Sequence, residues 1–159
     1  MRSILGAFVV TILCAGCSAP APGPATADTS ASDAAAHRAH EAYVTAINSN
    51  NLDTLLGVLT DDVVYMAAHE APMVGKAAVK PWLEGYLAAY KTRWDKPVQE
   101  FVVNGEWAYE RYSYTSTDTP VAGGEPVVDT GWGLVIYRRD ADGQWRVARD
   151  AWGPDHPAR

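Results

Sequence analysis

Residues 134–150, with the sequence LVIYRRDADGQWRVARD, predict two β-strands joined by a tight turn. Asp140-Ala141-Asp142-Gly143 supplies the turn, because Asp and Gly adopt backbone conformations that most residues avoid. The flanking residues extend these two strands to 126–139 and 144–152. A second turn signal, Asn104-Gly105, separates candidate strands at 98–104 and 106–117. The second half of the chain is therefore predicted to be a run of antiparallel strands.

The first half of the chain has the spacing of amphipathic helices. Apolar and aromatic residues recur every three or four positions in three stretches. These are Ala36, His40, Tyr43, Val44 and Ile47; then Leu52, Leu55, Leu56 and Leu59; then Val79, Trp82, Leu83, Tyr86, Leu87 and Tyr90. A short strand is predicted at residues 63–67, before the third helix. Helices followed by antiparallel strands predict an α+β domain whose sheet packs on the helices.

Three stretches of the chain together resemble a known superfamily. They are AYVTAINSNNLD (42–53), LTDDVVY (59–65) with VGKAA (74–78), and LVIYRR (134–139) with GQWRVARD (143–150). In this order they are similar to the nuclear transport factor 2-like superfamily, and within it to the SnoaL-like and ketosteroid-isomerase-like domains, a group that includes domain-of-unknown-function family 4440. The resemblance implies a cone-shaped curved antiparallel sheet packed on three N-terminal helices, an interior pocket and a homodimer.

The N-terminus predicts export and a lipid anchor. Residues 1–16 have a basic start and an apolar run of signal-peptide length. Leu13-Cys14-Ala15-Gly16-Cys17 resembles the lipobox of bacterial lipoproteins, with Cys14 where the pattern usually has Leu, so Cys17 is the expected lipidation site. Residues 17–32 are rich in Ala, Pro, Ser and Thr, which predicts a disordered tether before a single domain at 33–155. The predicted location is the cell envelope, either periplasmic or at the outer membrane; the alternative is ordinary secretion with Cys17 incidental.

Composition and charge exclude several classes of function. The 159 residues carry a formal net charge of −6, which disfavours a nucleic-acid partner. Both cysteines, Cys14 and Cys17, lie in the export segment, so the domain has no disulfide or thiol nucleophile. His37 and His40 have a spacing that could share a metal, but no third ligand is evident and an exposed helix face is preferred. We therefore expect neither a metal nor a cofactor.

The candidate site centres on Asp150 and Tyr43. Strand alternation places Ala148, Asp150 and Trp152 on one face, which the resemblance assigns to the pocket. On the neighbouring strand, Gly131 and Gly133 would leave room for a ligand. The expected ligand-binding residues are Tyr65, His69, Asp129, Trp132, Tyr137 and Trp152. An alternative is that Asp150 is structural and pairs with Arg149, Arg146 or Arg111.

Steroid isomerisation is not expected from these residues. The resemblance places the oxyanion-stabilising tyrosine of ketosteroid isomerase at Tyr43, but its base at Ala67 and its second aspartate at Gly133 or Val135. Both carboxyl groups are therefore missing. The leading prediction is a lipid-anchored domain that binds a small apolar or aromatic ligand. The alternatives are a cofactor-free lyase, isomerase or hydrolase using Asp150 and Tyr43, and a dimeric interaction module with a vestigial pocket.

Overall fold

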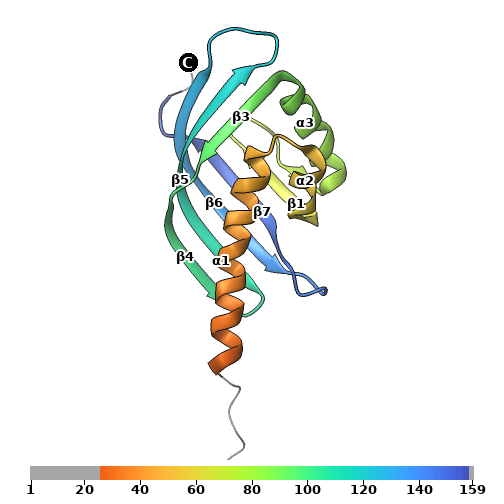
Figure 1. Cartoon of the computed structure of the whole chain (residues 1–159), viewed down its shortest axis with the longest axis vertical. Helices are drawn as coiled ribbons and strands as arrows, with labels where there is room; N and C mark the ends of the chain where they lie inside the picture. The colour runs from red at the N-terminus through yellow and green to blue at the C-terminus, as the bar shows by residue number, and fades with distance from the viewer. Residues whose placement is uncertain (1–25, 158–159) are drawn as a thin grey trace, which may run out of the picture.

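The computed structural model describes residues 26–157, which form one curved sheet with helices on its inner face (Figure 1). The elements are α1 (Thr26–Asn48), α2 (Leu52–Gly57), β1 (Leu59–Ala67), β2 (Met73–Val74), α3 (Lys76–Ala89), β3 (Tyr90–Asp95), β4 (Val98–Asn104), β5 (Trp107–Pro120), β6 (Val127–Arg139) and β7 (Trp145–Pro154). The strand order is β2-β1-β7-β6-β5-β3, and β4 also pairs with β5. The predicted α+β class is confirmed, as is the order of two helices, a first strand, a third helix and a following run of strands.

The sheet is not entirely antiparallel, which differs from the expectation. Strands β1 and β7 run parallel, and Tyr65 pairs with Asp150 in their register. These two strands lie at opposite ends of the domain sequence, so no hairpin turn fixes their relative direction. The other pairs, including the two predicted hairpins, are antiparallel.

Strand β5 is long enough to pair with two strands along one edge. Its first half pairs with β4 and its second half with β3. The chain passes between those two strands at Lys96 and Pro97. Proline cannot donate a ladder hydrogen bond, which suits this break. The break turns the Lys96 side chain inward, where none of its surface is exposed.

Several boundaries differ from the sequence predictions. Leu59, assigned to the second helical stripe, begins strand β1, which therefore starts four residues before the predicted 63. Helix α1 begins at Thr26, so residues 26–32, assigned to the disordered tether, are helical; residues 17–25 lie outside the described residues. The third helix ends at Ala89, and Tyr90 begins strand β3, which was not predicted. The strand was missed because Tyr90 continues the apolar helical stripe of α3 in the sequence.

The core lies between α1 and the sheet. Ala36, Ala39, Tyr43 and Ala46 form the buried stripe of α1, and the three alanines let the helix approach the strands closely. Strand β5 alternates between buried and exposed positions, and Tyr112 and Tyr114 point inward. In Figure 1 the first turns of α1 project beyond the end of the sheet, away from α3 and β3. None of the helices among residues 26–157 has the length and apolar character needed to cross a membrane.

Candidate functional site

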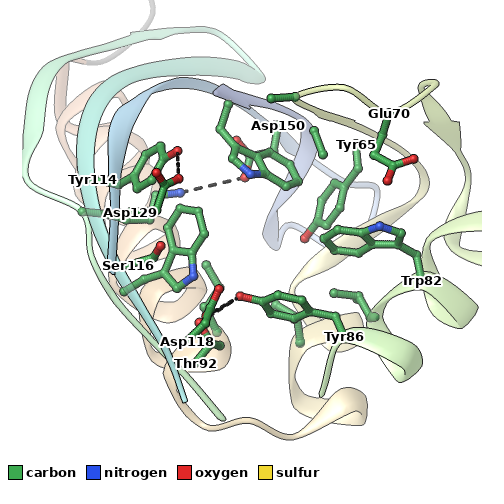
Figure 2. Close-up of a pocket in the computed structure, with 18 of the residues that line it drawn as sticks. Tyr65, Glu70, Trp82, Tyr86, Thr92, Tyr114, Ser116, Asp118, Asp129 and Asp150 are labelled. Carbon is green, nitrogen blue, oxygen red and sulfur yellow. Dashed lines mark hydrogen bonds and ion pairs between the residues drawn. The ribbon is translucent and has the colours of Figure 1, made fainter. Parts of the chain in front are cut away.

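A cavity of about 370 Å³ lies between α3 and the inner face of the sheet (Figure 2). Its walls are largely aromatic: Tyr65, Trp82, Tyr86, Trp94, Tyr114 and Trp152. Trp82 and Tyr86 stack nearly parallel, with ring centroids 5.5 Å apart, because they lie one turn apart on α3. The ring of Trp152 meets the rings of Tyr65 and Trp94 edge to face. These rings lie against one another along the walls and leave the interior open.

Asp150 forms the polar floor of the cavity, and only 3 % of its surface is exposed. The Tyr43 hydroxyl donates a hydrogen bond to Oδ2 at 2.7 Å, and the Tyr112 hydroxyl donates to Oδ1 at 3.0 Å. Both carboxylate oxygens are therefore engaged within the protein. The oxygen of the Tyr65 hydroxyl lies 2.9 Å from that of Tyr43, so a chain of two hydroxyls leads from the cavity wall to the carboxylate.

The charge partner of Asp150 is Lys96, not an arginine. The Lys96 Nζ lies 3.9 Å from Asp150 Oδ2 and over the Tyr112 ring, 3.7 Å from its centroid. The alternative prediction, that Asp150 pairs with an arginine, is wrong. A bulge in the β6–β7 register puts both Arg146 and Arg149 on the face of β7 opposite to Asp150, where they pair with surface carboxylates. Arg111 pairs with Glu100.

Burial dominates the electrostatics of this pair. Loss of water raises the pKa of Asp150 above its ordinary value, although Lys96 and the two tyrosine hydroxyls oppose the shift. Burial likewise lowers the pKa of Lys96, against the attraction of Asp150 and Glu110. The pKa of Tyr43 is raised by burial and by the nearby Asp150 charge, so this hydroxyl stays protonated and acts as a donor. The arrangement can hold a proton donor in a fixed position at the cavity floor.

A second buried carboxylate, Glu110, lies beyond the cavity. Its Oε2 accepts hydrogen bonds from the Tyr137 hydroxyl at 2.6 Å and from His40 Nδ1 at 2.9 Å. His37 stacks on Phe101, with ring centroids 4.1 Å apart. Neither histidine has the surroundings of a metal ligand, and residues 26–157 contain no cluster of three His, Cys, Asp or Glu that could hold a metal ion.

The structure brings most of the predicted site residues together. Tyr43, Tyr65, His69, Asp129, Asp150 and Trp152 all line the cavity. Two predicted ligand-binding residues, Trp132 and Tyr137, do not line the cavity. Trp132 is 61 % exposed on the outer face, because the alternation that turns Gly131 and Gly133 inward turns Trp132 outward. Tyr137 is fully buried farther along β6, where it contacts Glu110.

The space above the two glycines of β6 is filled by the protein's own tyrosines. Gly133 pairs with Tyr112 and Gly131 with Tyr114 across the β5–β6 ladder. A Cβ atom at either glycine would overlap the facing tyrosine ring. The prediction that these glycines leave room for a ligand is therefore wrong: they let two rings cross the sheet surface, and the Tyr112 hydroxyl thereby reaches Asp150.

Several cavity residues were not predicted from the sequence. Trp82 and Tyr86 were predicted only as members of the apolar stripe of the third helix, and this stripe also faces the cavity. Trp94 and Lys96 belong to the β3–β4 edge, which was not recognised. Asp118 lies near the end of β5, and the alternation of buried residues along that strand, extended by four positions from Tyr114, would have placed it inward.

Comparison with known proteins identifies the family. The model of the SnoaL-like domain matches residues 40–148. The chain belongs to the SnoaL-like domain family. A search of curated proteins found no match. Ala67, where ketosteroid isomerase would carry its base, lines the cavity of this SnoaL-like domain.

Solved structures show the same fold. A ketosteroid isomerase-like protein from Erwinia carotovora atroseptica is 26 % identical with a TM-score of 0.71, over 78 % of this chain and 96 % of that one. A conserved protein from Planctomyces limnophilus is also 26 % identical, with a TM-score of 0.70 over 79 % and 98 %. A nuclear transport factor 2-like superfamily protein from Salmonella enterica, 13 % identical, has a TM-score of 0.70 over 82 % and 94 %. The predicted nuclear transport factor 2-like fold is confirmed.

Proposed function

We propose that this SnoaL-like domain binds a small apolar or aromatic molecule in its interior cavity. The observation that carries the proposal is an open cavity whose walls are aromatic and whose floor is a fully hydrogen-bonded carboxylate. A volume of about 370 Å³ lies within the range of about 300–1,000 Å³ that small-molecule pockets span. Three tryptophans could have plugged a vestigial pocket: Trp107 and Trp132 are exposed residues outside the cavity, and Trp152 lies in its wall and leaves it open.

Native mass spectrometry of the full-length chain, purified from its own host envelope, tests ligand binding. We expect a co-purifying small molecule that is lost in Trp82→Ala, which removes one wall of the cavity. The control is Trp132→Ala, which deletes the same side chain from the outer face and leaves ligand occupancy unchanged. Equal occupancy in both variants would contradict the proposal.

Acid–base catalysis is a second candidate function. The hydroxyls of Tyr65 and Tyr43 lead to the buried Asp150, whose raised pKa suits proton transfer. If the domain turns over its bound molecule, Asp150→Asn should abolish turnover while ligand occupancy is retained. Turnover that survives this substitution would remove Asp150 from any catalytic role.

Export and lipid anchoring through Cys17 belong to the same proposal. The lipobox-like residues 13–17 support it, and they lie outside the described residues. Radioactive palmitate should label the wild-type chain and a Cys14→Ser control but not Cys17→Ser. Equal labelling of Cys17→Ser would contradict the lipid anchor and the cell-envelope location that follows from it.

The outer face of the sheet supports a homodimer. Trp107, Tyr109, Trp132 and Leu134 are 37–61 % exposed there, on the adjacent strands β5 and β6. An exposed apolar surface of this kind is typical of a protein–protein interface. Sedimentation equilibrium should give a dimer for the wild-type chain and a monomer for Trp132→Asp; a wild-type monomer at micromolar concentration would contradict the proposal.

A further inference from the structure

The charges around the cavity do not balance. Glu70, Asp118, Asp129 and Asp150 line it, and Lys96 is the one Lys or Arg among the described lining residues. Lys96 forms an ion pair with Asp150, and its Nζ lies 3.9 Å from Asp150 Oδ2. These charges leave the cavity acidic, which disfavours an anionic ligand.

Two of the remaining carboxylates differ in their partners. Asp129 has a neighbour that can neutralise it, since its Oδ1 lies 2.7 Å from His156 Nε2 at the cavity rim. Asp118 accepts a hydrogen bond from the Tyr86 hydroxyl at 2.6 Å, and no Lys, Arg or His of residues 26–157 forms an ion pair with it. Asp118 is therefore a cavity carboxylate whose counter-charge the described chain does not supply.

The surroundings of Asp118 suit an organic cation. In the β3–β5 register Asp118 pairs with Thr92, and Ser116 pairs with Trp94, so all four side chains share the inner face. The Tyr86 ring, which is hydrogen-bonded to Asp118, stacks on Trp82. Aromatic faces beside a carboxylate attract a cationic head group, because the ring quadrupole and the charge act in the same direction.

Ser116 gives an independent indication of a ligand. The residue is 97 % buried, since only 3 % of its surface is exposed. Figure 2 shows Ser116 at the cavity wall, on the same side as Asp118. Among the described residues, its hydroxyl has no hydrogen-bond partner. Its oxygen is not among the side-chain atoms that the protein closes off completely, so a molecule bound in the cavity can form a hydrogen bond with it.

We propose that the cavity selects a small primary ammonium ion with an apolar or aromatic body. The ammonium donates hydrogen bonds to the Asp118 carboxylate and the Ser116 hydroxyl, and the body lies between the aromatic walls. This inference rests on the proposed ligand-binding function and names the chemical class of its ligand. A metal ion is disfavoured at this place, because the neighbours of Asp118 are aromatic rings and hydroxyls rather than further carboxylates or imidazoles.

The test compares two probes of nearly the same shape on the purified full-length chain. Protonated 2-phenylethylamine carries the ammonium, and 2-phenylethanol replaces it with an uncharged hydroxyl. Titration followed by tryptophan fluorescence and calorimetry should show that the amine binds about tenfold more tightly. Equal or tighter binding of the alcohol would overturn the inference and leave the proposed function standing, whereas binding of neither probe would overturn both.

Substitutions assign the preference to Asp118. Asp118→Asn should reduce the ratio of the two affinities to about one and leave binding of the alcohol unchanged. Asp53→Asn removes the same charge from the exposed surface of α2, outside the cavity lining, and should keep the full preference. Tyr86→Phe retains the ring and the Asp118 charge, so it should keep a preference even if Asp118→Asn proves unstable. A preference that survives in Asp118→Asn, or is lost equally in Asp53→Asn, would overturn the assignment.

Discussion

Two buried carboxylates, Asp150 and Glu110, lie at the same level of the sheet but in different surroundings. Both pair with Val135, from β7 and from β5, so the three residues form a row across three strands. Asp150 faces the cavity, and burial raises its pKa. Glu110 lies in the packed end, where burial acts to raise its pKa, but hydrogen bonds from His40 and Tyr137 and the charge of Lys96 hold the pKa below its ordinary value. Position in the row decides which carboxyl group keeps its proton more readily.

Lys96 interacts with both carboxylates. It is in ion-pair distance of Asp150, and its charge acts on Glu110 as well. Its Nζ is buried without a hydrogen-bond partner, and the rings of Tyr43 and Tyr112 flank it. A lone cation therefore stabilises two negative charges in the core, with His40 available to assist at the Glu110 side.

The largest expected effect comes from removing this shared cation. Lys96→Met leaves two buried carboxylates without their common counter-charge and should lower the free energy of unfolding by about 3–5 kcal/mol at neutral pH. Urea denaturation followed by circular dichroism measures it. The matched control is Lys91→Met on β3, where the side chain is exposed and a change of less than about 0.5 kcal/mol is expected. A loss below about 1 kcal/mol in Lys96→Met would show that Lys96 is not needed to balance the two carboxylates.

A smaller effect should follow from disturbing only the Asp150 side of the row. Gly133→Ala places a methyl group where the Tyr112 ring lies, so this ring must shift away from Asp150. The expected destabilisation is about 1–3 kcal/mol, measured by thermal unfolding. Gly85→Ala is the control, since its added methyl group meets open space on α3 and should raise stability by about 0.5–1 kcal/mol. Unchanged stability of Gly133→Ala would mean that the Tyr112 ring moves freely.

The smallest effect is a difference in pH dependence, and it has opposite signs for the two carboxylates. A raised pKa in the folded chain means that Asp150 contributes most stability at acid pH and less as the pH rises from 3.8 through its folded pKa. A lowered pKa means that Glu110 contributes most above 4.5 and less as the pH falls. The stability lost in Asp150→Asn should therefore grow on going from about pH 7 to about pH 4, and the loss in Glu110→Gln should shrink, each by on the order of 1 kcal/mol. Urea denaturation at both pH values measures these losses of stability. Losses that change in the same direction in both variants would contradict the opposite pKa shifts of Asp150 and Glu110.

The sequence predicted the elements with strong periodicity and the positions that follow from alternation. The stripe of α1 predicts that Tyr43 is buried, and the alternation along β7 predicts that Asp150 and Trp152 share one face. Lys96 could not be found in this way, because it belongs to no repeating pattern and faces inward only where β3 gives way to β4. The role of Gly131 and Gly133 was also beyond the sequence, since it depends on which residues of β5 face them. Cross-strand register is a property of the assembled sheet, and no local pattern reports it.

The direction of helix α1 has a consequence for how the molecule would stand on a surface. Only its later turns reach the cavity, through Tyr43 and Ile47. At a rise of about 1.5 Å per residue, Thr26 begins the helix about 25 Å away from Tyr43. A bilayer anchor on the proposed Cys17 would therefore be joined to the domain at the end of α1 that lies farthest from the cavity-lining residues Tyr43 and Ile47.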